Sequence, residues 1–202
     1  MNFLKNFLHK HEEPKYQAKI LTIADLHGRL RPKDINMEMF QEIDAIIMLG
    51  DIDYRDYFIL KNYIPKEIPV YGIRGNHDAQ IKLEDYGIQD IHGKLIEVND
   101  IRIVGWEGSF KYKPSAVGFT QDESKDFAKI LIKAYGENVD YLFSHDAPYN
   151  VDTVDAAHKG LKGISEYITK TGCKNIHGHF HQSYKTQKQQ CVFGFEQITL
   201  TK

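Results

Sequence analysis

Cysteine is scarce in this sequence, and the shortage limits the classes of protein that it can encode. Cys173 and Cys191 are the only cysteines among 202 residues. Two thiols cannot build a disulfide framework or a zinc site made of thiolates. Their scarcity is typical of a reducing compartment, and we expect a cytoplasmic location.

An excess of charge of either sign is also missing. The chain has 26 Lys and Arg residues against 28 Asp and Glu residues, which gives a formal net charge of -2. A balanced chain provides no broad positive field to attract nucleic acid or anionic lipid. We therefore predict no strong affinity for nucleic acid.

Long hydrophobic runs are absent as well. No window approaches the roughly 18 apolar residues of a membrane span, so we predict none. Lys5 and Asn6 interrupt the apolar residues at the N-terminus, which therefore do not resemble a secretory signal. We expect an N-terminal extension over residues 1–18 and one domain over residues 19–202. The extension is predicted as a short amphipathic helix that touches a membrane or a partner, or as a frayed or surface-docked terminus.

Short runs of β-branched and aliphatic residues predict the strands. They lie at residues 19–24, 45–49, 70–73, 141–143 and 175–176, and the segments between them predict helices at 37–43, 57–63, 122–135 and 156–169. This alternation favours a mainly parallel sheet. A hairpin around Asn99-Asp100 and a tail over residues 184–201 add antiparallel strands. We predict a single α/β domain.

Ten histidines are present, and several of them follow the predicted strands. The strands are followed in turn by the polar clusters ADLHG (24–28), LGDID (49–53), RGNHD (74–78), SHDAP (144–148) and GHFH (178–181). In open α/β sheets the ligand crevice lies beyond the carboxyl ends of the strands, so we expect the clusters to converge. Each cluster alone also fits a turn or a core histidine. Five clusters at the same structural location favour one functional site.

The residue types in these clusters favour metal chemistry. Side chains of Asp, Asn and His without thiolates suit divalent ions such as Mn²⁺, Fe²⁺, Co²⁺, Ni²⁺ or Zn²⁺. The clusters offer more good ligands than one ion needs. Two ions that share a bridging carboxylate would use them, and that arrangement serves phosphoryl transfer.

The order Asp-x-His, Gly-Asp, Gly-Asn-His-Asp, His and Gly-His-x-His resembles the calcineurin-like metallophosphoesterase superfamily. The two histidines of the last motif resemble its small bacterial-type phosphodiesterase branch in particular. The resemblance implies a four-layer α-β-β-α sandwich with two mixed sheets and a dinuclear centre. It implies two divalent ions, with manganese favoured and iron, nickel, cobalt or zinc as alternatives. The implied ligands are Asp25, His27 and His181 for the first ion, Asn76, His145 and His179 for the second, and Asp51 as the bridge.

The resemblance also implies roles in catalysis. A hydroxide that bridges the two ions attacks phosphorus in line, and His77 protonates the leaving group. Asp78 orients His77 or is a solvated turn carboxylate. Arg74, Arg55 and Asn76 bind the substrate phosphate, with a salt bridge elsewhere as the alternative for Arg55.

Several other positions have two interpretations each. Asp53 lies beside a ligand histidine or caps the following helix, and His158 lines the pocket or lies outside it. His177 is expected to be buried structure rather than a ligand. The loop from Trp106 to Pro114 stacks a base or covers the site, or is a packed surface loop.

The function predicted from these residues is metal-dependent hydrolysis of a phosphate ester. We favour a phosphodiesterase that acts on a small or nucleotide substrate. A phosphomonoesterase or a nucleotide pyrophosphohydrolase is the alternative. A metal-binding scaffold without catalysis is a further alternative, which we disfavour because no ligand position of the motifs is missing.

Overall fold

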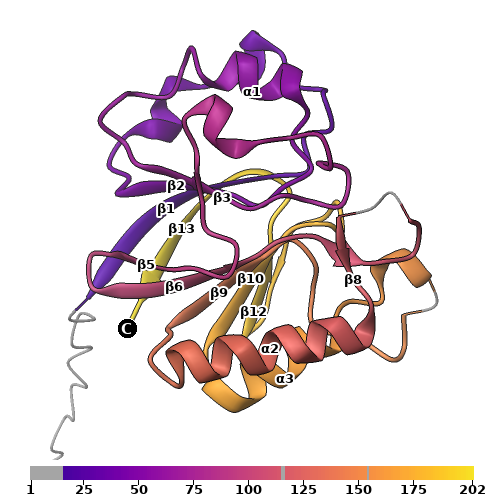
Figure 1. Ribbon diagram of the computed structural model, residues 1–202. Helices are drawn as coiled ribbons and strands as arrows, with labels where there is room; N and C mark the ends of the chain where they lie inside the picture. Colours follow the sequence, from indigo (N-terminus) through magenta and orange to yellow (C-terminus); the bar gives the residue numbers. More distant parts are fainter. Residues whose placement is uncertain (1–15, 115–116, 154) are drawn as a thin grey trace, which may run out of the picture.

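The structure is a computed structural model that describes residues 16–114, 117–153 and 155–202. Two large sheets face each other (Figure 1). The first has the strand order β13-β1-β2-β3-β4: Gly194–Thr201, Gln17–Ala24, Ala45–Met48, Val70–Gly72 and Gln89–Asp90. The second has the order β11-β12-β10-β9-β6-β5: Tyr184–Lys185, Gln189–Cys191, Lys174–His177, Tyr141–Ser144, Ile101–Trp106 and Leu95–Val98. A small sheet pairs β7 (Ser109–Phe110) with β8 (Gly118–Phe119).

The predicted parallel strands are divided between the two large sheets. Strands β1, β2 and β3 are parallel neighbours in the first sheet, and β6, β9 and β10 are parallel neighbours in the second. The single mainly parallel sheet expected from the strand order alone is therefore wrong. The two mixed sheets implied by the family resemblance are confirmed, because the chain changes sheet after β4.

The antiparallel additions follow the prediction with one difference. Val98 pairs with Ile101 across a turn in which Asn99 and Asp100 both have positive φ, as a two-residue hairpin requires. In the tail, β13 runs antiparallel to β1, and β11 runs antiparallel to β12. Strand β12, however, lies parallel to β10. Alternation within a strand indicates one buried face, but it does not select the direction of the neighbouring strand.

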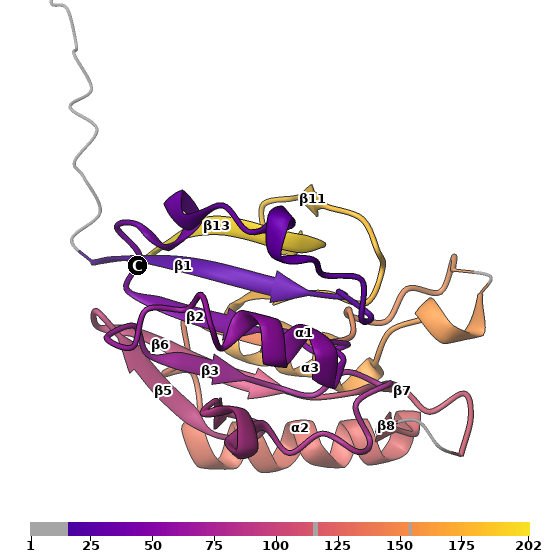
Figure 2. The ribbon, with the colours of Figure 1, turned by 90° about the horizontal axis from the view of Figure 1, so that it is seen from above.

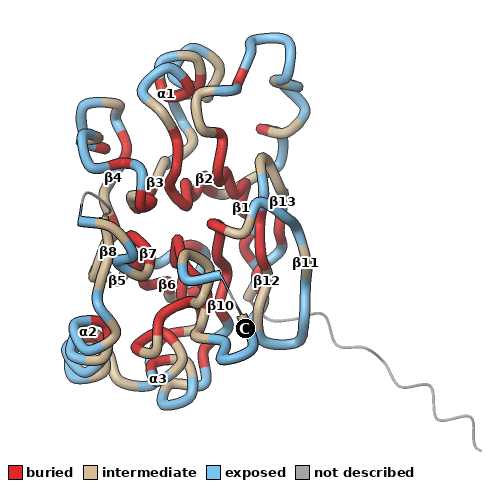
Figure 3. The backbone as a smooth tube through the Cα atoms, turned by 90° about the vertical axis from the view of Figure 1, so that its right-hand side faces the viewer, coloured by how far each residue is buried: buried red, intermediate tan, exposed pale blue. Residues whose placement is uncertain are grey.

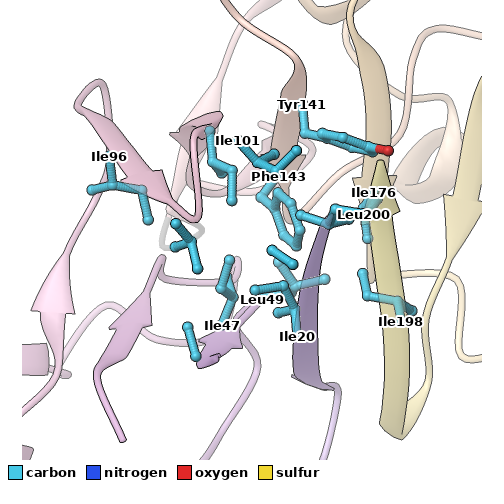
Figure 4. Packing of buried hydrophobic residues seen from close by; sticks show 14 of the residues in the cluster. Ile20, Ile47, Leu49, Ile96, Ile101, Tyr141, Phe143, Ile176, Ile198 and Leu200 are labelled. Carbon is cyan, nitrogen blue, oxygen red and sulfur yellow. The ribbon is translucent and has the colours of Figure 1, made fainter. Parts of the chain in front are cut away.

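The main core lies between the two sheets. In β2, Ile47 points into this core, whereas Ile46 and Met48 point to the opposite face of the sheet. Figure 4 shows Ile47 with Phe143 and other residues of both sheets in the same cluster. Strands that are covered on both faces need apolar residues at successive positions, which explains the continuous apolar runs in the sequence.

Helices cover the outer faces of the sheets and complete four layers (Figures 1 and 2). Helix α1 (Tyr54–Leu60) packs on the first sheet, and α2 (Gln121–Tyr135) and α3 (Lys162–Thr171) pack on the second. Short 3-10 helices lie at Pro32–Asp34 (η1), Met37–Phe40 (η2), Leu83–Tyr86 (η3) and Ala156–His158 (η4). None of the described helices is long and apolar enough to cross a membrane.

Three helix predictions differ from the structure. The helix predicted at 57–63 begins three residues earlier, because Asp53 caps its N-terminus. The one predicted at 37–43 is only the 3-10 turn η2. The one predicted at 156–169 is split into η4 and α3, because Leu161 forms a β-bridge with Pro148. The predicted N-terminal helix lies outside the described residues.

Candidate metal centre

The five polar clusters follow the carboxyl ends of strands from both sheets. In Figure 3 the buried stretches of the two sheets, drawn in red, face each other in the middle of the molecule. Within the first sheet, the backbone N–H of Asp25 donates to the carbonyl of Gly50 at 3.1 Å, and within the second, Gly178 donates to His145 at 3.1 Å. Between the sheets, the backbone N–H of His179 donates to Asp25 Oδ2 at 2.8 Å. These bonds hold turns from distant parts of the sequence side by side.

Two groups of side chains in these clusters have the arrangement of metal ligands. In each group, all the donor atoms lie within 4.8 Å of one another. The first group contains Asp25, His27 and His181. The second contains Asp51, His145 and His179. These six residues are all among the ligands predicted from the sequence.

The first group brings together atoms that repel one another without a cation or a shared proton. Nε2 of His27 and Nε2 of His181 lie 2.9 Å apart, and Nε2 of His181 lies 4.0 Å from Asp25 Oδ1. Asp25 Oδ1 is buried and has no hydrogen-bond partner among the described residues. A divalent ion at this position would satisfy all three atoms, so the group fits a metal.

Hydrogen bonds fix the histidine tautomers of the second group. Nδ1–H of His145 donates to the Leu49 carbonyl at 2.7 Å, and Nε2–H of His179 donates to the Ala157 carbonyl at 2.8 Å. The other nitrogen of each neutral ring then carries a lone pair. Nδ1 of His179 is buried and without a hydrogen-bond partner in the described part of the chain. Carbonyl groups orient metal-binding histidines in this way in known sites.

Asn76 and Asp51 extend the second group. Nε2 of His145 lies 2.9 Å from Asn76 Oδ1 and 3.5 Å from Asp51 Oδ2. The same Asp51 oxygen lies 3.8 Å from Nε2 of His27 in the first group, while Asp51 Oδ1 accepts from the backbone N–H of His77 at 2.9 Å. One oxygen of Asp51 thus faces a donor of each group, which is the place a bridging carboxylate occupies.

The backbone of the polar clusters is strained. In the described ranges, eight non-glycine residues have positive φ, and five of them belong to the two groups: Asp25, His27, Asp51, His179 and His181. This conformation is uncommon for residues with a side chain and concentrates at functional sites. Gly75 permits the tight turn, because a Cβ at that position would lie 2.2 Å from Asp51 Oδ1.

The charges of the buried groups show the preference for a cation. Burial raises the pKa of Asp25 to about 7, although His145 opposes the change. Burial would also raise the pKa of Asp51, but His145 and His77 together outweigh burial and hold it below its usual range. Burial lowers the pKa of His145, yet Asp51 and Asp25 overcome this and raise it to about 10. The carboxylates of Asp25 and Asp51 thus favour positive charge at this position, and a bound cation would supply it.

His77 lies on the open side of these groups. Its side chain is exposed, and its ring centroid lies 5.5 Å from that of His27. A cleft of about 420 Å³ lies here, and His27, Asp53, Tyr54, His77, Asp78, Gln80 and Ile81 line it. A group at this position can reach a bound substrate without being a ligand.

Asp78 has a different position from both sequence interpretations. It is buried, so it is not a solvated turn carboxylate. Its Oδ2 accepts from the backbone N–H of Asp51 at 2.7 Å and of Gly75 at 2.8 Å. The described structure gives it no hydrogen bond to His77. It holds the turn that carries Asp51, because two backbone donors converge on it.

The two predicted phosphate-binding arginines are both paired with carboxylates. Arg74 binds Glu107 through Nε and Nη2 at 2.8 Å and 2.9 Å. Nε of Arg55 binds Asp53 at 2.8 Å, as the salt-bridge alternative had it. Asp53 also caps α1, so its second interpretation is confirmed. Sequence spacing places an arginine near a site but does not show which carboxylate it meets.

One residue with a place in the site, Asp56, was not predicted, and one contact of the loop from Trp106 to Pro114 could not be foreseen. Asp56 is fully buried and accepts from the backbone N–H groups of Gly28 at 2.6 Å and Leu30 at 3.0 Å. Its position three residues after Asp53 predicts a capping box at the start of α1. That spacing does not predict the hydrogen bonds to Gly28 and Leu30. The Tyr112 hydroxyl accepts from Asn76 Nδ2 at 3.1 Å, so this loop contacts the site as one of its interpretations expected.

The remaining candidates separate into near and distant positions. The His158 ring lies beside that of His179, with centroids 4.8 Å apart. His177 is fully buried, and burial lowers its pKa to about 4, as expected of a structural histidine. Trp106 is fully buried in β6, so the interpretation that this side chain stacks on a base is wrong.

Comparisons with known proteins show the fold and the family of this chain. One crystal structure has a TM-score of 0.62 at 11% identity, over 87% of this chain and 90% of its own. The 5′-nucleotidase from Candida albicans SC5314 has a TM-score of 0.54 at 11% identity, over 90% of this chain and 46% of its own, so this chain spans less than half of that protein. Among curated proteins there is no match. The calcineurin-like phosphoesterase superfamily domain matches residues 18–194, and the chain therefore belongs to that superfamily.

Proposed function

We propose that this protein is a dinuclear metal-dependent phosphodiesterase that acts on a small or nucleotide phosphate ester. The family supports metal-dependent hydrolysis of phosphate esters in general. The observation that supports a dinuclear centre is the position of Asp51, whose Oδ2 lies 3.8 Å from a donor of one ligand group and 3.5 Å from a donor of the other.

The proposed ligands form two sets, one for each ion, which follow the two groups of side chains described above. Asp25, His27 and His181 hold one ion, Asn76, His145 and His179 hold the other, and Asp51 belongs to both. When bound, a pair of divalent ions lowers the pKa of a water molecule for attack on phosphorus and neutralises the phosphoryl oxygens. Manganese is our first choice, with iron, nickel, cobalt and zinc as alternatives for the same donor set.

His77 is proposed as the general acid. The oxygen that leaves phosphorus needs a proton unless it belongs to a good leaving group. The exposed ring of His77 borders the cleft beside His27, and its backbone N–H is already bound to Asp51 Oδ1. The ring is therefore free to turn toward a leaving group while its backbone stays fixed.

Substrate phosphate has fewer protein cations than the sequence suggested. Arg55 already binds Asp53, and Arg74 already binds Glu107, so we assign the two arginines only a minor part in binding the substrate phosphate. The amide of Asn76, which donates to Tyr112, remains a candidate for contact with a phosphoryl oxygen. The ions then carry most of the charge neutralisation.

A phosphomonoesterase is the alternative that one observation favours. That observation is the structural likeness, at 11% identity, to a protein described as a 5′-nucleotidase. The cytoplasmic location expected from the sequence remains a prediction.

Turnover of bis-p-nitrophenyl phosphate with Mn²⁺ tests the proposal. We expect the wild type to release p-nitrophenol and Asp51→Asn to lose at least about 100-fold in rate, because the shared oxygen is replaced or neutralised. Asp122→Asn is a matched control, since its side chain is 93% exposed on α2. Equal rates for Asp51→Asn and the wild type would exclude the proposed centre.

A second assay separates the two substrate classes. Methyl p-nitrophenyl phosphate and p-nitrophenyl phosphate share one leaving group and differ in the ester count at phosphorus. We expect a higher kcat/KM for the diester. A strong preference for the monoester would overturn the diesterase assignment and leave the metal centre intact.

A further inference from the structure

Exposed aromatic side chains are concentrated around the metal centre. Among the described residues, four aromatic side chains are prominently exposed: Tyr54 (59%), Phe58 (71%), Tyr112 (37%) and Phe193 (40%). Three of them adjoin residues of the centre, and the fourth lies one helical turn after Tyr54. Single exposed aromatics are ordinary, but a gathering of them at a cleft marks a contact surface.

Tyr54 stands on the His27 side of the centre. It is the first residue of α1 and lines the 420 Å³ cleft together with His27 and His77. The Arg55 guanidinium lies 5.8 Å from its ring centroid and is itself held by Asp53 at 2.8 Å. The ring thus has a supported position while most of its surface faces solvent.

Phe193 stands on the His181 side. Its ring centroid lies 5.9 Å from that of His181, and its backbone N–H donates to Ser183 Oγ at 3.3 Å. His27 and His181 meet at 2.9 Å between their Nε2 atoms. Tyr54 thus shares a cleft with one histidine of this pair, and the Phe193 ring lies beside the other.

Tyr112 is a different case. Its hydroxyl accepts a hydrogen bond from the amide of Asn76 at 3.1 Å, and this bond explains why the side chain lies beside the centre. The rings of Tyr54 and Phe193 have no such explanation in the described structure. Their flat faces next to a phosphate site suit a substrate that carries a flat ring of its own.

We propose that Tyr54 and Phe193 form an aromatic rim that selects phosphate esters whose organic group carries a planar aromatic ring, such as a nucleoside. The inference rests on the proposed function, because the rim is defined relative to the phosphate at the metal centre. Stacking on an exposed aromatic is independent of hydrogen-bond pattern, so the rim selects planarity rather than one particular base.

Binding of two phosphonates tests the rim without turnover. Benzylphosphonate and cyclohexylmethylphosphonate have the same charge and nearly the same size, and the C–P bond of each resists hydrolysis. Calorimetry with the Mn²⁺-loaded full chain should show benzylphosphonate binding about tenfold more tightly, the lower range of measured stacking effects. The double variant Tyr54→Ala/Phe193→Ala should bind both phosphonates equally.

Two further variants guard against a general structural effect. Tyr54→Phe keeps the ring and should keep the preference. Phe58→Ala removes an exposed aromatic of the same helix that does not line the cleft, and it should also keep the preference. Loss of the preference in Phe58→Ala to the same extent would contradict the assignment.

The outcomes separate the rim from the proposed function. Equal binding of the two phosphonates by the wild type, or no measurable binding of either, overturns the rim. A retained preference in the double variant does the same. A benzyl preference in a protein that fails to hydrolyse bis-p-nitrophenyl phosphate supports the rim and removes only the proposed function.

Discussion

Two buried atoms of the metal centre, Asp25 Oδ1 and His179 Nδ1, have no hydrogen-bond partner among the described residues. A buried polar atom left unpaired costs about 1–3 kcal/mol. Each atom belongs to one of the two groups of side chains that fit a cation, so coordination of a metal ion by these atoms would offset the cost. The strained φ angles of the same turns add to the cost of building the site without metal.

At the residue scale, His77→Ala separates acid catalysis from metal binding. The substitution keeps the backbone N–H that donates to Asp51 Oδ1, so metal content should remain near that of the wild type. Turnover of an alkyl phosphodiester should fall by about 100-fold or more, and that of a p-nitrophenyl ester by less. Metal analysis and paired rate measurements check both parts. Wild-type rates on the alkyl ester would remove His77 from the mechanism.

At the scale of elements, helix α1 is joined to the turn after β1 through Asp56. This buried carboxylate accepts from Gly28 and Leu30 in that turn and from the backbone of Asp53 at 3.2 Å. His27 precedes Gly28 directly. The helix therefore helps to place a proposed metal ligand, although it provides none itself.

Asp56→Ala should disturb both the fold and the site. It leaves buried backbone donors without an acceptor, and we expect a loss of about 2–4 kcal/mol in the free energy of unfolding. Mn²⁺ binding should weaken as well, because the turn after β1 loosens. Urea unfolding and metal titration measure the two effects. Asp53→Ala is the control, since loss of the cap costs about 1 kcal/mol and leaves the bonds to Gly28 and Leu30 in place.

The contact between α2 and α3 depends on Gly163. A Cβ at this position would lie 2.0 Å from the Ser124 carbonyl oxygen, so Gly163→Ala must separate the helices. We expect a destabilisation of about 1–3 kcal/mol, typical of overpacking, with Mn²⁺ affinity unchanged. Thermal unfolding compares it with Glu166→Ala, a substitution at an exposed position of the same helix. An unfolding temperature no lower than that of the control would contradict this account.

At the scale of the whole molecule, the metal centre joins the two sheets. Asp25 and Asp51 follow strands of the first sheet, and His145 and His179 follow strands of the second. Both proposed ion sites include residues from both sheets. Metal binding should therefore stabilise the packing of one sheet on the other as well as the local turns.

Metal removal should lower global stability accordingly. At an ion concentration 100 times the Kd, binding to one site of the folded state stabilises it by about 2.7 kcal/mol. We expect Mn²⁺ to raise the Tm of the wild type by several degrees and a chelator to reverse the rise. Asp122→Asn should respond like the wild type, and Asp51→Asn should respond much less. An equal response of both variants would show that the ions bind elsewhere.

The sequence by itself determined the strands that precede the polar clusters, the hairpin at Asn99-Asp100 and the positions of the clusters after those strands. These features depend on local periodicity and on residues adjacent to strand ends, and Asp25, Asp51 and His145 could be located by them. The order of the motifs also predicted the family and its two-sheet architecture, which the structure confirms.

Only the tertiary structure decided which groups meet across the chain. It paired Arg74 with Glu107, placed Asp78 under the turn of Asp51, and set Asp56 against the turn after β1. Each of these contacts joins residues whose separation along the chain carries no periodic signal. Their energies depend on burial and on distances of a few ångströms, which exist only after the two sheets have packed together.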